Sequence, residues 1–185
     1  MPQSIINSGQ EKMEKTIESL KRELQSVKTG RANPGILNKV EVVYYGSPMP
    51  LNQIATISVP EAQILMIKPF DKNILRDIEK AIQLADLNLT PQNDGTVIRL
   101  VFPPLTEQTR KQLVKELKVN SENNKVAIRN IRRDIIDQLR KFEKESLITE
   151  DELKRYEEQT QKLTDKFIGK VEEVIKEKET QIMEF

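Results

Sequence analysis

Basic side chains that could bind phosphate are concentrated between residues 106 and 140. This segment has nine Lys and Arg residues against five Asp and Glu residues, although the whole chain has a net charge of only +1. Its densest part is the run Arg129-Asn130-Ile131-Arg132-Arg133. The planar guanidinium of Arg can donate two parallel hydrogen bonds to phosphate oxygens. The segment therefore predicts a surface that binds a nucleic-acid backbone.

Eight of these nine basic residues also share one side of a helix. On a helical wheel of about 100° per residue the eight occupy one arc of about 100°, interrupted by Glu122 and Ile136. Charge pairing with an antiparallel neighbour would place them on both sides of the apolar ridge, whereas the arc adjoins one side only. The alternative is a solvated helix face without a partner. We call this set the basic arc: Lys111, Lys115, Lys118, Lys125, Arg129, Arg132, Arg133 and Arg140.

Residues suited to catalysis are scarce. The chain has no Cys and no His, which excludes disulfides, thiolate nucleophiles, imidazole bases and Cys or His metal sites. It also lacks phosphate-binding glycine loops, nucleophile elbows and acidic calcium loops. Of the adjacent Tyr44 and Tyr45, strand alternation predicts that one is buried and the other exposed. We therefore predict a protein that is not an enzyme and needs no cofactor, metal or small-molecule substrate.

Three long helices must position the arc. The first thirty residues, 106–145 and the segment from Thr149 onward each have apolar residues at heptad-like spacing. The second of these helices would be roughly 60 Å long, which favours an elongated three-helix bundle over a compact globule. Thr149 is the predicted N-cap of the third helix. No segment has the length and apolarity of a membrane span or signal peptide, so we expect a cytoplasmic protein.

Residues 31–104 have a different pattern. Four short β-branched or aromatic runs, 39–46, 54–59, 64–70 and 96–102, predict strands, and one helix is predicted between the third and fourth. The fold class is α+β: a three-helix bundle, formed by 1–30 and 105–185, with an inserted small β/α/β domain at 31–104. Gly and Pro in the two linkers predict a hinge, although a fixed elbow stiffened by proline fits the same composition. The hinge residues are Thr29, Gly30, Arg31, Ala32, Pro103, Pro104 and Leu105.

The chain resembles the bacterial ribosome recycling factors over essentially its whole length. Five stretches carry the resemblance: KTGRANP, VVYYGSPMPLNQIA, IEKAIQLADLNLTPQNDGTVIRL, PPLTEQTRKQLVK and VAIRNIRRD. The resemblance implies an L-shaped protein with roughly the outline of transfer RNA. It also implies that the protein binds the ribosome after termination and, with elongation factor G and its GTP hydrolysis, splits the subunits and frees them from mRNA.

The resemblance further implies which residues and partners are involved. The bundle would contact rRNA of the large subunit, and the smaller domain would face elongation factor G. We expect a monomer. The alternative function is a coiled-coil or chaperone-like module that binds proteins through its helical tips, which leaves the basic arc unexplained. The rRNA-binding residues implied by the matching motifs and the arc are Arg110, Lys125, Arg129, Arg132, Arg133, Lys28 and Arg31.

Overall fold

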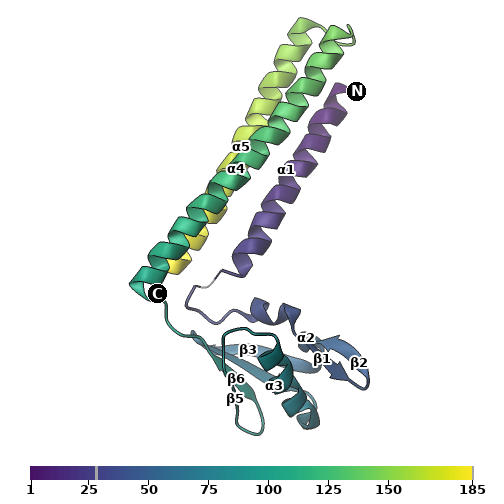
Figure 1. The fold of residues 1–185 in the computed structure, drawn as a ribbon. Coiled ribbons are helices and arrows are strands. Elements are labelled where there is room, and N and C mark those ends of the chain that lie inside the picture. The colour runs from purple at the N-terminus through teal and green to yellow at the C-terminus, as the bar shows by residue number, and fades with distance from the viewer. Residues whose placement is uncertain (28, 185) are drawn as a thin grey trace. The chain divides into compact units, whose positions relative to one another are not determined.

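The computed structural model describes residues 1–27 and 29–184, which divide into two compact units (Figure 1). Unit 1 consists of Met1–Val27 together with Gln108–Glu184. Unit 2 consists of residues 29–107. The first is built from helices and the second mainly from antiparallel strands, so the predicted α+β class is confirmed.

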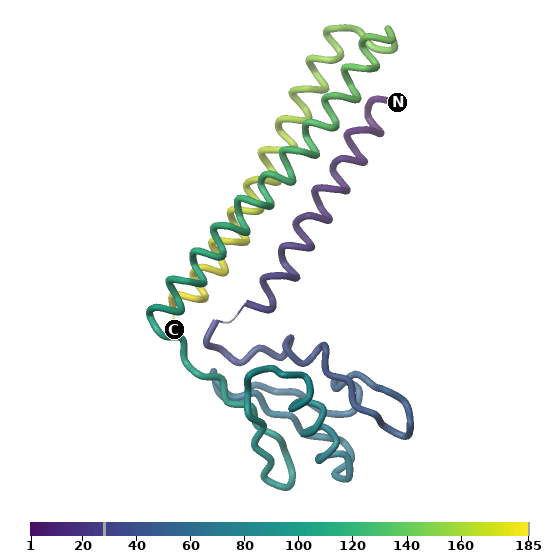
Figure 2. Tube along the Cα trace, in the orientation of Figure 1, coloured from purple at the N-terminus to yellow at the C-terminus, as the bar shows by residue number. Residues whose placement is uncertain are grey.

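Unit 1 is a bundle of three helices: α1 (Pro2–Gln25), α4 (Glu107–Lys144) and α5 (Glu150–Met183). Helix α5 returns antiparallel to α4, and the N-terminus lies at the same end of the bundle as the α4–α5 turn (Figure 2). The expected apolar ridges are buried, including Leu20, Leu24, Ile128 and Ile135. Helix α1 ends earlier than Thr29-Gly30 because the Ser26 hydroxyl donates to the Glu23 carbonyl oxygen at 2.7 Å and competes with helix continuation.

Close contact between α1 and α4 depends on Gly9. This residue is buried on α1, and a Cβ atom added to it would lie 2.2 Å from Ile135 Cδ1 on α4. On α5, by contrast, a Cβ added to Gly169 would meet no atom within 4 Å. Gly9 therefore serves the packing of two helices, whereas Gly169 has no such role.

A reciprocal cap starts α5 at the predicted position. The Thr149 N–H donates to Glu152 Oε2 at 2.8 Å, and the Glu152 N–H donates to Thr149 Oγ1 at 3.2 Å. The hydrogen bonds from Thr149, first from its backbone and then from its hydroxyl, hold the pKa of Glu152 below its usual value. This capping box satisfies backbone donors that the first helical turn would otherwise leave without partners.

Unit 2 is built on a four-stranded antiparallel sheet in the order β3-β4-β6-β5. The strands are β3 (Ala55–Glu61), β4 (Ile64–Pro69), β5 (Pro91–Asn93) and β6 (Ile98–Val101). Helix α3 (Leu75–Leu84) buries Ile78 and Ile82 in the same apolar cluster as the β4 and β6 side chains. The short helices of this unit are η1 (Pro34–Lys39), α2 (Leu51–Ile54) and η2 (Lys72–Ile74).

A separate two-stranded ribbon was predicted only in part. Strand β1 (Glu41–Tyr44) was expected, but its antiparallel partner β2 (Ser47–Pro50) and strand β5 were not. Pro is rare inside sheets because it lacks an N–H donor, so the sequence SPMP did not indicate a strand. Between β1 and β2 the chain reverses through only two residues, Tyr45 and Gly46.

The turn before β6 is organised by the carboxylate of Asp94. Its Oδ1 accepts hydrogen bonds from the N–H groups of Thr96 and Val97 at 2.9 and 2.8 Å, and its Oδ2 pairs with Arg99. The hydrogen bonds from Val97 and Thr96, followed by that from Arg99, lower the pKa of Asp94 far below its usual value. The ionised carboxylate therefore stabilises the folded turn.

We expect Asp94→Ala to lower the melting temperature of unit 2 at pH 7, with a difference that shrinks as the pH falls. The pKa of Asp94 is lower in the folded state than in the unfolded chain, where it is about 3.9. The ionised carboxylate therefore stabilises the folded state fully above about pH 3.9, and this stabilisation is lost as the pH falls through the folded pKa. Circular dichroism melts between pH 7 and pH 2 would measure the difference in melting temperature. Arg99→Gln should lower the melting temperature less, because the backbone N–H groups of Thr96 and Val97 still donate to Asp94. A difference that stays constant with pH would contradict this account.

The two linkers meet unit 2 at one turn. The Ala32 N–H donates to the Ala62 carbonyl oxygen at 2.7 Å, and the Phe102 N–H donates to the Gln63 carbonyl oxygen at 2.8 Å. Ala62 and Gln63 are adjacent residues between β3 and β4, so the entry and exit of unit 2 lie side by side. Within the described residues, no helix has the length and apolar character needed to cross a bilayer.

Candidate nucleic-acid interface

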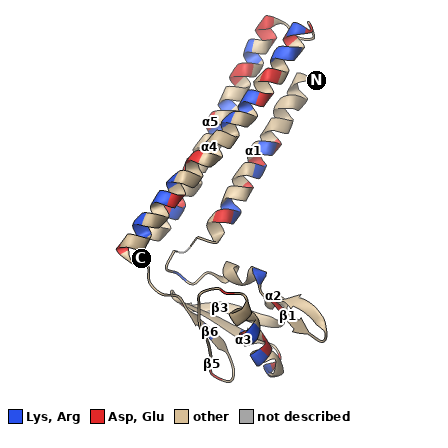
Figure 3. Cartoon of the chain, in the orientation of Figure 1, with Lys and Arg blue, Asp and Glu red and all other residues tan. Residues whose placement is uncertain are grey.

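Helix α4 presents several members of the basic arc to solvent. Lys115, Lys118 and Arg133 are exposed, and within residues 1–27 and 29–184 none of the three forms an ion pair. Figure 3 shows Lys and Arg distributed along the length of α4. A partner could therefore bind these three cations without first breaking an ion pair within the protein.

Three other arc members are paired with acids, which corrects the sequence-based interpretation. Lys125 Nζ lies 2.9 Å from Glu172 Oε1 and Arg140 Nε lies 3.2 Å from Glu157 Oε1, so both contact α5. Arg129 Nη1 lies 3.2 Å from Glu122 Oε1 within α4. The pairing with a neighbouring helix that we had disfavoured thus occurs at Lys125 and Arg140. Surface pairs such as these, in which at least one partner is well exposed, are worth about 0–1 kcal/mol and can be exchanged for phosphate.

A wheel of α4 alone does not show where α5 lies against it, and this explains the result. Ile136, which interrupts the arc on the wheel, is buried. Arg140 reaches Glu157 on α5, and both residues line a groove between the two helices.

Arg110 and Arg132 carry buried donors without acceptors. The Nε of each side chain is inaccessible to solvent and has no hydrogen-bond partner among the described residues. A buried polar group left unsatisfied costs about 1–3 kcal/mol, and more when it is charged. Because both Nε atoms are inaccessible, a partner molecule could reach them only if the side chains rearranged.

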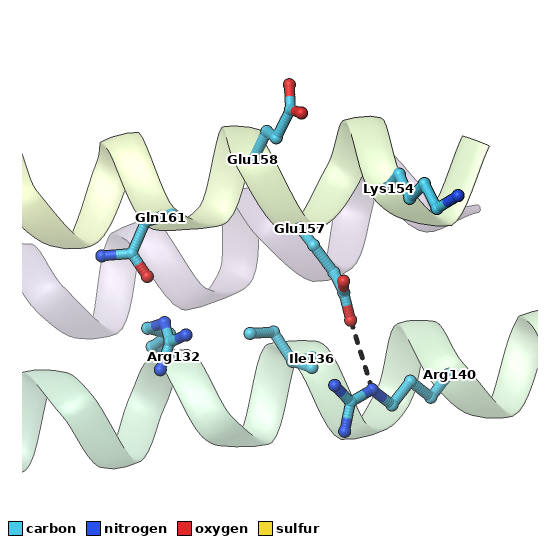
Figure 4. Close-up of a pocket in the computed structure, with 7 residues that line it drawn as sticks. All are labelled: Arg132, Ile136, Arg140, Lys154, Glu157, Glu158 and Gln161. Atoms are coloured by element: carbon cyan, nitrogen blue, oxygen red, sulfur yellow. Dashed lines mark hydrogen bonds and ion pairs between the residues drawn. The ribbon is translucent and has the colours of Figure 1, made fainter. Parts of the chain in front are cut away.

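Arg132 lies in a groove between α4 and α5. The groove encloses about 350 Å³, and in Figure 4 Arg132 and Ile136 point from α4 toward α5, while Glu158 points away from α4. Gln161 reaches from α5 toward Arg132. Sequence reasoning missed the groove because its far wall belongs to α5, and which residues of two helices face each other cannot be read from either helix alone. Its lining residues are Arg132, Ile136, Arg140, Lys154, Glu157, Glu158 and Gln161.

Two predicted rRNA-binding residues do not belong to α4. Arg31 is exposed and belongs to unit 2. Lys28 lies outside the described residues. Over the part of the chain that the structure describes, no group of three or more acidic side chains is arranged to hold a metal ion.

Comparison with known proteins identifies the family. The sequence profile of the family "Ribosome recycling factor" matches residues 20–183. The chain belongs to the ribosome recycling factor family. The ribosome-recycling factor of Geobacillus sp. (strain WCH70) is 55% identical over 184 residues, covering 100% of both chains. The resemblance seen in the five sequence stretches is thereby confirmed, and so is the conclusion that this is a translation factor and not an enzyme.

Solved structures of the ribosome recycling factor family share the fold. A solution structure of the ribosome recycling factor aligns with a TM-score of 0.82 at 39% identity, covering 100% of this chain and 98% of that one. The factor in the models for the T. thermophilus ribosome recycling factor and the E. coli elongation factor G bound to the E. coli post-termination complex aligns with a TM-score of 0.66 at 43% identity. That alignment covers 99% of each chain.

Proposed function

We propose that the protein binds the post-termination ribosome through rRNA of the large subunit and, with elongation factor G and GTP, splits the subunits and releases them from mRNA. Membership of the ribosome recycling factor family supports this proposal. So does the T. thermophilus relative, which is bound to a post-termination complex together with elongation factor G. The nucleotide belongs to the partner, and the protein itself acts as a monomer by binding and displacement.

The observation that carries the rRNA contact is the set of exposed cations on α4. Lys115, Lys118 and Arg133 are exposed and form no ion pair among the described residues. Phosphate oxygens are strong acceptors for such cations and match a guanidinium in geometry and charge. Lys125 and Arg129 can exchange their carboxylate partners for phosphate. Arg110 and Arg132 are partly buried and would contact phosphate through their terminal Nη groups, because the Nε of each is inaccessible. Arg31 and Lys28 are proposed as contacts close to the first linker.

Cosedimentation over a salt series tests this function. Purified protein would be spun with vacant ribosomes and with isolated subunits, after which elongation factor G and GTP would be added. We expect binding to the large subunit that weakens steeply as salt rises, because released counterions drive association with RNA. Subunit splitting should require both factors. Failure to bind ribosomes at low salt would overturn the proposal and favour the module that binds proteins through its helical tips.

We also propose that the two linkers act as a hinge through which elongation factor G moves unit 2. Gly30 has a φ of 78°, a left-handed conformation that Gly adopts without strain. Ala32 and Phe102 are hydrogen-bonded into unit 2, so bending would be confined to Thr29, Gly30 and Arg31 on one strand and to Pro103, Pro104 and Leu105 on the other. Ala32, one of the predicted hinge residues, moves with unit 2 in this proposal.

Cross-linking the two linkers should reduce subunit splitting while leaving ribosome binding intact. The chain has no native Cys, so Thr29→Cys combined with Pro104→Cys gives a single reactive pair for a short bifunctional thiol reagent. A tether between the linkers would restrict rotation of unit 2. Each single-Cys variant treated with the same reagent provides the control. Splitting at an undiminished rate with the tether in place would show that hinge motion is unnecessary.

A further inference from the structure

The turn at the end of the β1–β2 ribbon holds a bulky residue in an unfavourable conformation. Tyr45 and Gly46 form the whole two-residue turn and have φ values of 49° and 80°. A turn with two positive φ angles is a type I′ hairpin turn, in which Asn-Gly is strongly preferred. A Tyr at the first position is strained, because its Cβ crowds the backbone in the left-handed region. The fold alone would favour Asn at this position.

The strained residue displays its ring to solvent. Tyr45 is 88% exposed, so burial of its own ring does not compensate for the backbone cost. The ring is nevertheless held in place, since the ring centroids of Tyr44 and Tyr45 are 4.4 Å apart at an interplanar angle of 67°. Tyr44 itself packs against the core of unit 2. A hydrogen bond between the two side chains raises the pKa of Tyr44 above its usual value. Tyr45 therefore presents nearly its whole ring to solvent while one contact places it beside Tyr44.

The ribbon on either side of Tyr45 has exposed apolar residues and, beyond Glu41, no charge of its own. Besides the hydrogen bond with Tyr45, the carboxylate of Asp71, from outside the ribbon, contributes to the raised pKa of Tyr44. Val43 is 64% exposed and lies directly opposite the exposed Pro48 in the strand register. No charged residue occurs between Glu41 and Glu61, although 32% of the whole chain is charged. Figure 3 shows the outer part of the ribbon without Lys, Arg, Asp or Glu. We call Val43, Tyr45 and Pro48 the ribbon tip.

These properties distinguish between two classes of partner. Binding to a nucleic-acid backbone depends on cations, which α4 has and the ribbon tip lacks. Protein interfaces, in contrast, are centred on uncharged, desolvated contacts in which a Tyr ring commonly fills a pocket on the partner. A Tyr side chain has only two rotatable bonds between its backbone and its ring, so it loses little conformational freedom on binding. The chemistry of the ribbon tip therefore fits an apolar pocket on a protein.

We propose that Tyr45 is an anchor that inserts into an apolar pocket of elongation factor G. This inference rests on the proposed function, in which elongation factor G is the protein that acts on unit 2. The T. thermophilus relative, bound on the ribosome with that factor, supports the choice of partner. The free-energy cost of the left-handed Tyr is then retained because the ring is needed for binding, as expected where strain occurs at a functional position.

Tyr45→Asn tests the anchor, because it removes the ring and relieves the strain together. We expect an unchanged or higher melting temperature for unit 2, and unchanged affinity and salt dependence for ribosomes alone. The concentration of elongation factor G required for half-maximal subunit splitting should rise about tenfold, in line with removal of one anchor residue. Tyr45→Phe, which keeps the ring, should stay within about twofold of the original chain.

Leu84→Asn is the matched control, since Leu84 is 86% exposed at the end of α3 in the same unit. It should leave the requirement for elongation factor G unchanged. Three results for Tyr45→Asn would overturn the inference: an unaltered requirement for elongation factor G, weaker ribosome binding without that factor, or a lower melting temperature, which would make Tyr45 structural. If the original chain neither binds ribosomes nor splits them, the proposed function itself fails, and the inference fails with it.

Discussion

Replacing Lys115, Lys118 and Arg133 together with Ala is expected to weaken ribosome binding on the order of 100-fold at about 0.1 M salt. Each is an exposed cation on α4 without an ion pair among the described residues. A net cost of about 1 kcal/mol for each phosphate interaction removed leads to this value. The slope of log affinity against log salt should become shallower by about 1 for each cation that no longer binds phosphate. Cosedimentation over a salt series measures both quantities.

A triple substitution on α5 provides the control. Changing Lys162, Lys166 and Lys176 to Ala removes the same charge from exposed positions on another helix of unit 1. If the ribosome responds only to total charge, both variants will lose affinity equally. If the basic arc is the contact surface, only the α4 variant will show the shallower slope of log affinity against log salt. Helicity measured by circular dichroism should be unchanged in both, since the side chains are exposed.

Gly9→Ala is expected to destabilise the bundle by about 1–3 kcal/mol relative to Gly169→Ala. Both substitutions replace a helical Gly by Ala and gain about 1 kcal/mol of helix propensity. Only the first forces a methyl group to 2.2 Å from Ile135 Cδ1 and 2.7 Å from Ile135 Cγ1. Because Ile135 is itself buried, its side chain has little room to move away. Thermal or urea unfolding of the two variants would measure the difference.

A double variant shows whether the clash is the cause. Ile135→Val removes the Cδ1 methyl that the new side chain at position 9 would meet, so combining it with Gly9→Ala roughly conserves volume at the contact. The two substitutions should be less destabilising together than the sum of the single changes, with a coupling of about 0.5–3 kcal/mol. Simple additivity would show that Gly9→Ala acts through something other than contact with Ile135.

The helices were well predicted because their signals are local. The heptad spacing of Leu20, Leu24, Ile128 and Ile135 matches the buried face, and the capping box at Thr149 formed as expected. Strand β2 was missed because it pairs despite its two prolines, a result of packing in the ribbon that its own composition does not indicate. The register between strands depends on neighbours that are separate in the sequence.

The sequence predicted which cations lie on the candidate surface, but not which of them form ion pairs with acids. The cluster at Arg129, Arg132 and Arg133 lies on α4 as expected. Which cations are paired depends on how α4 and α5 lie against each other, and this cannot be read from one segment. The buried Nε atoms of Arg110 and Arg132 likewise depend on packing between helices. The strain at Tyr45 was hidden because a run of β-branched and aromatic residues indicates only a strand.

The attachment of both linkers to adjacent carbonyls has a consequence for the order of folding. Helices α1 and α4 are separated by roughly 80 residues, and closing a loop of that length in the unfolded chain is entropically unfavourable. Once unit 2 has folded, the hydrogen bonds from Ala32 and Phe102 hold its entry and exit together, and roughly ten residues of linker remain as the effective loop. The closure entropy scales with the logarithm of loop length, so prior folding of unit 2 lowers the cost of docking α1 onto α4 and α5 by roughly 2 kcal/mol. The inserted unit thereby turns a distant contact into a local one, which favours faster assembly of the bundle.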